Sequence, residues 1–279
     1  MIFDCHTHFG RETDIGGAFL GDAQKAWGKD FRMACGEAEH EAAIEQCDGA
    51  IVLALDAQEA GYYVPNECVA EYVGRHPGKL YGFASVNPNR PNSERLLEEA
   101  RRTYGLRGLK LAPIYQFFNP TDSKCYPLYA KAQELGMPIM WHQGTSYLHQ
   151  GPLEVCNPVL LDPIARSFPD LKMIVAHLGH PWYSETVSLV RKHPNVFADI
   201  SALGMRPWQM YNALVCAMEY GILEKLFFGT DFPFFNCFQT LAALRNVNAV
   251  AEGTNMPRIP EKAIEDIIHR NTPEILDIV

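Results

Sequence analysis

The residues of this chain best suited to chemistry are histidines and carboxylates at the ends of short apolar segments. His6 and His8 stand two residues apart in the first such segment, so on a strand both side chains point to the same face. Two imidazoles on one face can share a metal ion, although an isolated His-x-His pair is more often a surface or hydrogen-bonded pair. His142, His177 and Asp231 end three later apolar segments. These five residues are the first candidates for a metal site.

The elements that would position these residues are short apolar segments that alternate with longer amphipathic ones. Strands are expected at 2–6, 50–55, 80–86, 106–111, 137–142, 172–177, 195–200 and 225–230. Helices are expected near 37–47, 65–75, 93–103, 123–135, 157–168, 182–193, 207–221 and 239–250. Eight strand–helix units predict an α/β fold, a single (β/α)8 TIM barrel. An open doubly wound sheet is the alternative, but no G-x-G-x-x-G or P-loop turn follows a strand.

No linker or change in composition divides the chain, so residues 1–279 are interpreted as one domain. Residues 9–36 form a long first strand-to-helix loop, whose glycines, Trp27 and Phe31 suit a lid or a pocket wall. Residues 260–279 are expected to add one or two C-terminal packing helices.

The carboxyl ends of parallel barrel strands meet at one mouth, where the active sites of such enzymes lie. His142, His177 and Asp231 occupy three of these ends and would join His6 and His8 there. Histidines scattered through a core would have no reason to recur at strand ends. The pattern therefore favours a metal site over structural histidines.

Five motifs together resemble the amidohydrolase-related family, and within it the branch of aminocarboxymuconate-semialdehyde decarboxylase-like enzymes. They run in the expected order from residue 2 to about residue 276: DCHTH at 4–8, GLKL at 108–111, His142, AHLG at 176–179 and GTDFP at 229–233. The combination is specific to the family, whereas each motif alone is not. The resemblance does not indicate the substrate.

The resemblance implies a mononuclear site with His6, His8, His142 and Asp231 as metal ligands. Imidazole and carboxylate ligands suit zinc, with manganese, iron or cobalt as alternatives. Asp231 would also act as general base on a metal-activated water. His177 would be a catalytic residue near that water and would polarise the substrate oxygen.

Lys110 stands at the end of the fourth strand, where two-metal relatives carry a carbamylated lysine that bridges the ions. A binuclear site that uses Lys110, His142 and His177 is therefore a minority alternative. A role for Lys110 in binding a substrate anion or supporting a metal ligand is favoured, because the GLKL form resembles the mononuclear branch.

Other polar residues are weaker candidates for contact with the substrate or the ligands. His180 follows His177 by three residues, and Arg11 and Arg206 lie in strand-to-helix loops at the edge that contacts substrates. Most loop residues merely face water. Asp4 is expected to share the inner face with His6, where it would orient a ligand or satisfy backbone donors.

The expected function is that of a metal-dependent hydrolase acting on a small carboxylate-bearing amide, lactone or ester. A nonoxidative metal-dependent decarboxylase of an unsaturated or aromatic acid is the alternative. A metal-dependent nuclease or phosphoesterase is disfavoured, because such barrels typically place a glutamate where this chain has Lys110. A noncatalytic binding barrel is also disfavoured, because the ligand set is complete and binding alone does not need an open metal position.

Composition and charge limit the partners. The chain has 24 Lys and Arg against 33 Asp and Glu, a net charge of −9, which argues against nucleic acid or a membrane surface. A small anionic molecule in a locally positive pocket is the expected partner. No apolar run is long enough for a membrane span, no signal peptide is recognised, and the 8 cysteines form no C-x-x-C pair, so a cytoplasmic location is expected. Barrels of this kind often form homodimers, but no segment marks an interface.

Overall fold

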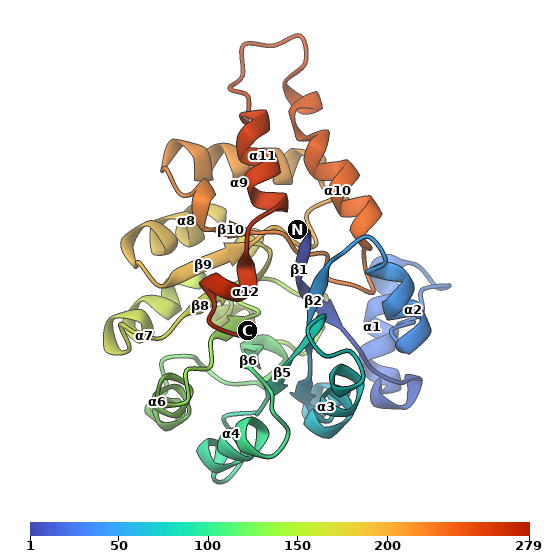
Figure 1. Ribbon diagram of the computed structural model, residues 1–279, viewed down its shortest axis with the longest axis vertical. Coiled ribbons are helices and arrows are strands. Elements are labelled where there is room, and N and C mark those ends of the chain that lie inside the picture. The colour runs from blue at the N-terminus through green and yellow to red at the C-terminus, as the bar shows by residue number, and fades with distance from the viewer.

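Eight strands form one parallel sheet in sequence order, as the computed structural model of residues 1–279 shows (Figure 1). They are β1 Phe3–His8, β2 Gly49–Leu53, β5 Leu80–Ser85, β6 Gly108–Leu111, β7 Ile139–Trp141, β8 Met173–Val175, β9 Val196–Asp199 and β10 Leu226–Phe227. The sheet closes because β1 also pairs with the segment after β10: Cys5 N donates to Phe228 O at 3.0 Å, and His8 N donates to Phe232 O at 2.9 Å. The predicted (β/α)8 barrel is confirmed.

Helices between the strands form an outer ring, which Figure 1 shows end-on. They are α2 Glu37–Ala43, α3 Asn66–Gly74, α4 Ser93–Arg102, α6 Tyr126–Glu134, α7 Asp162–Ser167, α8 Tyr183–Lys192, α9 Pro207–Glu219 and α10 Cys237–Arg245. In α4 the apolar Leu97 and Ala100 are buried against the barrel, while the arginines and glutamates of the helix remain partly or fully exposed. Each expected strand and helix overlaps an observed one.

Two apolar clusters separate the inside of the barrel from its outer layer. A small inner cluster, to which Phe3, Ile51, Phe83 and Phe227 belong, fills the barrel beneath the mouth. A larger cluster of 65 buried residues lies between the strands and the helices. Strands buried on both sides explain why the sequence shows continuous apolar runs rather than alternation.

A β-bulge interrupts β1 just below the mouth. Asp4 pairs with Ala50 and Thr7 with Val52, so β1 has one residue more than β2 in this interval. Ala50 and Val52 pack in the outer cluster, so Asp4 and Thr7 also point outward. Asp4 therefore does not share the inner face with His6, contrary to the alternation expected of a regular strand.

The long first loop contains a helix that the sequence did not predict, α1 Gly17–Trp27. Its glycines have low intrinsic helix propensity, and the helix is stabilised by packing of Phe19 and Ala23 against the barrel. A short hairpin, β3 Leu55–Ala57 with β4 Tyr62–Val64, was also unforeseen.

The expected C-terminal helices are α11 Glu261–Ile268 and α12 Thr272–Ile275. None of the helices combines the length and the apolar character needed to span a lipid bilayer.

Candidate functional site

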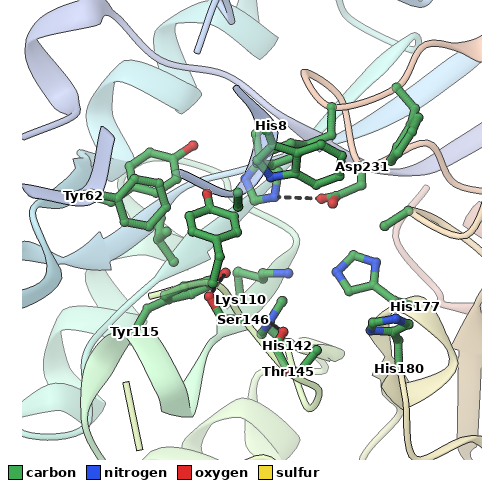
Figure 2. A pocket seen from close by; sticks show the side chains of 18 of the residues that line it. His8, Tyr62, Lys110, Tyr115, His142, Thr145, Ser146, His177, His180 and Asp231 are labelled. Atoms are coloured by element: carbon green, nitrogen blue, oxygen red, sulfur yellow. Dashed lines mark hydrogen bonds and ion pairs between the residues drawn. The ribbon is translucent and has the colours of Figure 1, made fainter. Parts of the chain in front are cut away.

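The carboxyl ends of the strands surround a cavity of about 330 Å³ (Figure 2). Its polar wall includes His8, Lys110, His142, His177, His180, Arg206 and Asp231. Its aromatic wall includes Phe19, Trp27, Tyr62, Tyr115, Tyr147, Phe234 and Phe235. The barrel thus brings most of the predicted site residues to one place.

Three of the predicted metal ligands converge on one point. Asp231 Oδ1 lies 3.4 Å from His6 Nε2 and 3.4 Å from His8 Nε2. The three ligand atoms lie within 4.8 Å of one another, and all three residues are buried. This geometry comes from two elements, because β1 carries both histidines and the turn after β10 carries the aspartate.

Asp199, the last residue of β9, orients His6. Its Oδ2 accepts a hydrogen bond from His6 Nδ1 at 3.0 Å. A carboxylate can only accept, so Nδ1 carries the hydrogen and Nε2 keeps its lone pair for a cation. Asp199 is not among the residues predicted from the sequence, although an acidic residue at the end of a predicted strand was the same signal that identified Asp231.

Asp199 also holds His177. The backbone N–H of His177 donates to Asp199 Oδ1 at 2.9 Å, and Ser201 Oγ donates to the same oxygen. Because the Ser201 hydrogen is used in that way, Ser201 Oγ accepts from His177 Nδ1, 2.7 Å away. The neutral His177 ring therefore has its lone pair at Nε2, where it can accept a proton or bind a metal ion. His6, His177 and Asp199 form a second group of ligand atoms within 4.8 Å.

His142 lies on the cavity wall but outside both groups. Its Nε2 lies 3.1 Å from the carbonyl oxygen of Thr145, which can only accept, so this nitrogen carries the hydrogen. Nδ1 is then the nitrogen left to bind a metal ion. The ring centroid is 5.2 Å from that of His177. The ligand role of His142 stays a prediction that needs Nδ1 or a reoriented ring.

Burial keeps the imidazoles neutral, with their lone pairs free. Burial, followed by the charge of Lys110, lowers the pKa of His8 to about 3 and that of His142 to about 3. The same causes hold the pKa of His6 well below its usual value. Burial raises the pKa of Asp231 well above its usual range, while Lys110 opposes this shift. A cation beside Asp231 would favour its ionised form.

Lys110 lies near the carboxyl end of β6, one residue before Leu111, and is only 2% exposed. Its Nζ lies 3.2 Å from His6 Nε2, next to a predicted metal ligand. Burial lowers its pKa to about 8, while Asp231 and Asp199 raise it. This position is compatible with binding an anion, with supporting a ligand and with the carbamylated alternative, so the role of Lys110 stays a prediction.

A divalent cation fits these residues. Two imidazole nitrogens and one carboxylate oxygen surround a common point, and Asp199 holds His6 in the tautomer that a ligand needs. His8 Nδ1 is buried without a hydrogen-bond partner, so no competing contact fixes the His8 ring. Zinc, manganese, iron and cobalt all accept such a nitrogen and oxygen set.

Of the weaker candidates, His180 and Arg206 lie at the cavity and Arg11 does not. His180 Nε2 lies 2.7 Å from Gln209 Oε1, and Arg206 Nη1 donates to Ala202 O at 3.0 Å. Arg11 has an exposed side chain that pairs with Asp14, with Nη2 3.1 Å from Oδ1. Because Arg11 does not line this cavity, the structure does not support a substrate contact by Arg11.

A family model described as Amidohydrolase matches residues 3–278 of this chain. Among curated proteins, a dihydroorotase from Helicobacter pylori (strain HPAG1) is 32% identical over 119 residues, which cover 39% of this chain and 34% of that protein. The match thus spans about a third of the length of the curated relatives.

Several solved structures share the fold over nearly the whole chain. A TIM-barrel protein from Bordetella bronchiseptica, described as uncharacterized, has a TM-score of 0.76 and 19% identity over 99% of this chain and 98% of its own. A dihydroxybenzoic acid decarboxylase from Polaromonas sp. JS666, with bound manganese and the inhibitor 2-nitroresorcinol, has a TM-score of 0.69 and 16% identity, covering 99% and 96%. A probable 2-pyrone-4,6-dicarboxylic acid hydrolase from Acinetobacter baumannii, with citric acid bound, has a TM-score of 0.68 and 14% identity, covering 99% of each chain.

Replacing a converging ligand should remove the metal. We expect His8→Ala and Asp231→Ala each to retain less than about a tenth of an equivalent of metal after purification, measured by mass spectrometry of the metal content. His180→Ala is the matched control, because His180 lines the same cavity and bonds to Gln209. His177→Ala should keep the metal and lose turnover; loss of metal there would make His177 a ligand.

Asp199→Ala should weaken metal binding about 10- to 100-fold, because His6 loses the carboxylate that fixes its tautomer. Competition with a chromogenic chelator measures this affinity. Asp162→Ala is the control, since Asp162 makes an equivalent contact to His193, 2.8 Å away, on the barrel exterior. Equal affinities of the two variants would contradict the role assigned to Asp199.

Proposed function

Because this chain belongs to the amidohydrolase family, we propose that it is a metal-dependent hydrolase of a small carboxylate-bearing amide, lactone or ester. The observation that carries the proposal is the convergence of His6, His8 and Asp231 on one point in a cavity at the mouth of the barrel. Nitrogen and oxygen donors of this kind favour zinc, with manganese, iron or cobalt as alternatives. A single ion is proposed, and two ions bridged by carbamylated Lys110 are the alternative.

A divalent ion bound there would polarise a substrate carbonyl and lower the pKa of a coordinated water. The protein itself supplies the groups that move protons. Asp231 would take a proton from the attacking water, and His177 Nε2 offers a second acceptor. Once protonated, His177 can donate to the developing oxyanion or return the proton to the leaving nitrogen or oxygen. Asp199 and Ser201 hold His177 in place through these steps.

The cavity is suited to an anionic small molecule. Arg206 lines it; its guanidinium donates a hydrogen bond to the Ala202 carbonyl, and the guanidinium carbon lies 5.7 Å from the centroid of the Trp27 ring. The remaining N–H groups of its guanidinium are available for a carboxylate, which this planar group binds through two hydrogen bonds. Lys110 adds a second cation deeper in the cavity. We propose Arg206 as the anchor of the substrate carboxylate.

A decarboxylase is the second candidate. The aromatic wall suits an unsaturated or aromatic acid, and one of the similar structures is a dihydroxybenzoic acid decarboxylase. In that reaction a proton replaces the departing carboxylate on carbon, and protonated His177 or Asp231 would deliver it. Both reactions use the same ligands, so the product distinguishes them.

The reaction type is testable with metal-loaded enzyme. We expect hydrolysis within a panel that contains 2-pyrone-4,6-dicarboxylate, dihydroorotate and 2,6-dihydroxybenzoate, with products identified by liquid chromatography and mass spectrometry. Released carbon dioxide is measured in parallel. Carbon dioxide without a hydrolysis product would replace the hydrolase proposal with the decarboxylase.

Arg206→Ala should raise KM at least about tenfold with little change in kcat, because it removes binding that the ground state and the transition state share. Steady-state kinetics on the active member of the panel measures both constants. Arg11→Ala serves as the control, since Arg11 carries the same charge on an exposed loop outside the cavity. An unchanged KM in Arg206→Ala would contradict the proposal that Arg206 binds the substrate carboxylate.

A further inference from the structure

Two tyrosines of the cavity wall have hydroxyls without any partner. Tyr62 belongs to β4 and Tyr147 to the loop after β7, and both line the cavity. Each hydroxyl oxygen is shielded from solvent and makes no hydrogen bond. Tyr62 is only 3% exposed. These groups take no part in the chemistry described above.

Other buried tyrosine hydroxyls of this protein do have partners. Tyr115, on the same wall, accepts a hydrogen bond from Ser146 Oγ at 2.9 Å. Tyr129, on the barrel exterior, donates to Pro120 O at 3.0 Å. Folded proteins pair the large majority of buried polar groups, and an unpaired hydroxyl lowers stability. Such a group in a substrate cavity indicates a partner that arrives with the ligand.

Tyr62 lies close to one of the predicted metal ligands. The ring of Tyr62 lies 6.3 Å from that of His8. Figure 2 shows Tyr62 and Tyr115 across the cavity from His177 and His180. Burial, with a contribution from the charge of Asp231, raises the pKa of both Tyr62 and Tyr147 far above the usual value. Both therefore remain hydrogen-bond donors.

Helix α1 covers these two rings. The Phe19 centroid lies 5.0 Å from that of Tyr62 and 5.7 Å from that of Tyr147. The helix starts after Gly16 and stops at Gly28, whose φ of 109° suits only glycine, and it buries just Phe19 and Ala23. Phe19 is therefore the side chain of α1 that packs against both rings.

We propose that Tyr62 and Tyr147 determine specificity by donating hydrogen bonds to an oxygen substituent on a planar, ring-bearing carboxylate. The flat aromatic side chains of the wall match a planar ring, and Arg206 receives its carboxylate. The inference rests on the proposed function for the reaction that follows binding. The binding step itself requires only the cavity.

Phenylalanine substitutions test the proposal, because they remove each hydroxyl and preserve the ring. Tyr62→Phe and Tyr147→Phe should leave the melting temperature unchanged or raise it by about 2 °C, since no hydrogen bond is lost. Tyr115→Phe, the matched control, should lower it by about 2 °C, because the contact with Ser146 is lost. Differential scanning calorimetry measures all three.

Ligand binding supplies the second readout, with 2,6-dihydroxybenzoate and benzoate as probes in isothermal titration calorimetry. The wild-type holoenzyme should bind 2,6-dihydroxybenzoate at least about tenfold more tightly than benzoate. Each of Tyr62→Phe and Tyr147→Phe should reduce that preference several-fold and leave benzoate binding unchanged. Tyr115→Phe should keep the full preference.

Three results would overturn the proposal: a wild-type enzyme that binds neither probe or does not distinguish them, Phe variants that keep the preference, or Phe variants destabilised like Tyr115→Phe. The last result would mean that buried water already satisfies the hydroxyls. Metal content is measured on the same samples. Failure of the hydrolase proposal would appear as absent metal or absent hydrolysis with the hydroxyl preference intact, so the two failures are distinguishable.

Discussion

A single buried carboxylate, that of Asp199, connects the two sides of the reacting centre. One oxygen fixes the tautomer of His6, and the other holds the backbone of His177 and the hydroxyl of Ser201. Because all of these contacts are inaccessible to water, each is stronger than it would be at the surface. The same carboxylate also offsets the positive charge of Lys110, which is buried nearby. Without this anion, the two imidazoles would lose the hydrogen bonds that orient them, and the buried ammonium of Lys110 would lose a nearby negative charge.

The barrel makes this convergence possible through its closure. The segment after β10 pairs with β1, where Asp231 N donates to His6 O at 2.8 Å. This backbone contact joins residues more than two hundred positions apart, so the carboxylate of Asp231 meets His6 and His8 wherever the barrel forms. The bulge in β1 adds the local irregularity that directs Asp4 away from the site, where it accepts from the backbone and hydroxyl of Thr230. Position along the strand and closure of the sheet together determine the metal geometry.

Much of this arrangement could be predicted from the sequence because it follows from strand periodicity. Apolar runs located all eight strands, and polar residues at their ends identified the side chains that the mouth brings together: His6, His8, His142, His177, Lys110 and Asp231. Side-chain hydrogen bonds are not periodic, so the sequence could not show that the Thr145 carbonyl accepts a hydrogen bond from Nε2 of His142. Helix α1 was missed because tertiary packing, not propensity, stabilises it. The sequence also could not show that Arg11 lies outside the cavity, because the path of a long loop leaves no pattern in the sequence.

The site also concentrates backbone conformations that other residues avoid. His177, Leu178 and Asp231 all have positive φ, at 56°, 49° and 64°, although none is glycine. Such conformations cost stability and persist only where surrounding contacts over-determine them, here the Asp199 bond to His177 N and the β1 bond to Asp231 N. The unpaired hydroxyls of Tyr62 and Tyr147 on the same cavity wall lower the stability of the fold further. A fold selected only for stability would relax both features, since a regular turn and phenylalanine would serve better. Their presence at one mouth indicates that the outer ring of helices and the large apolar cluster stabilise a centre that is itself held under strain.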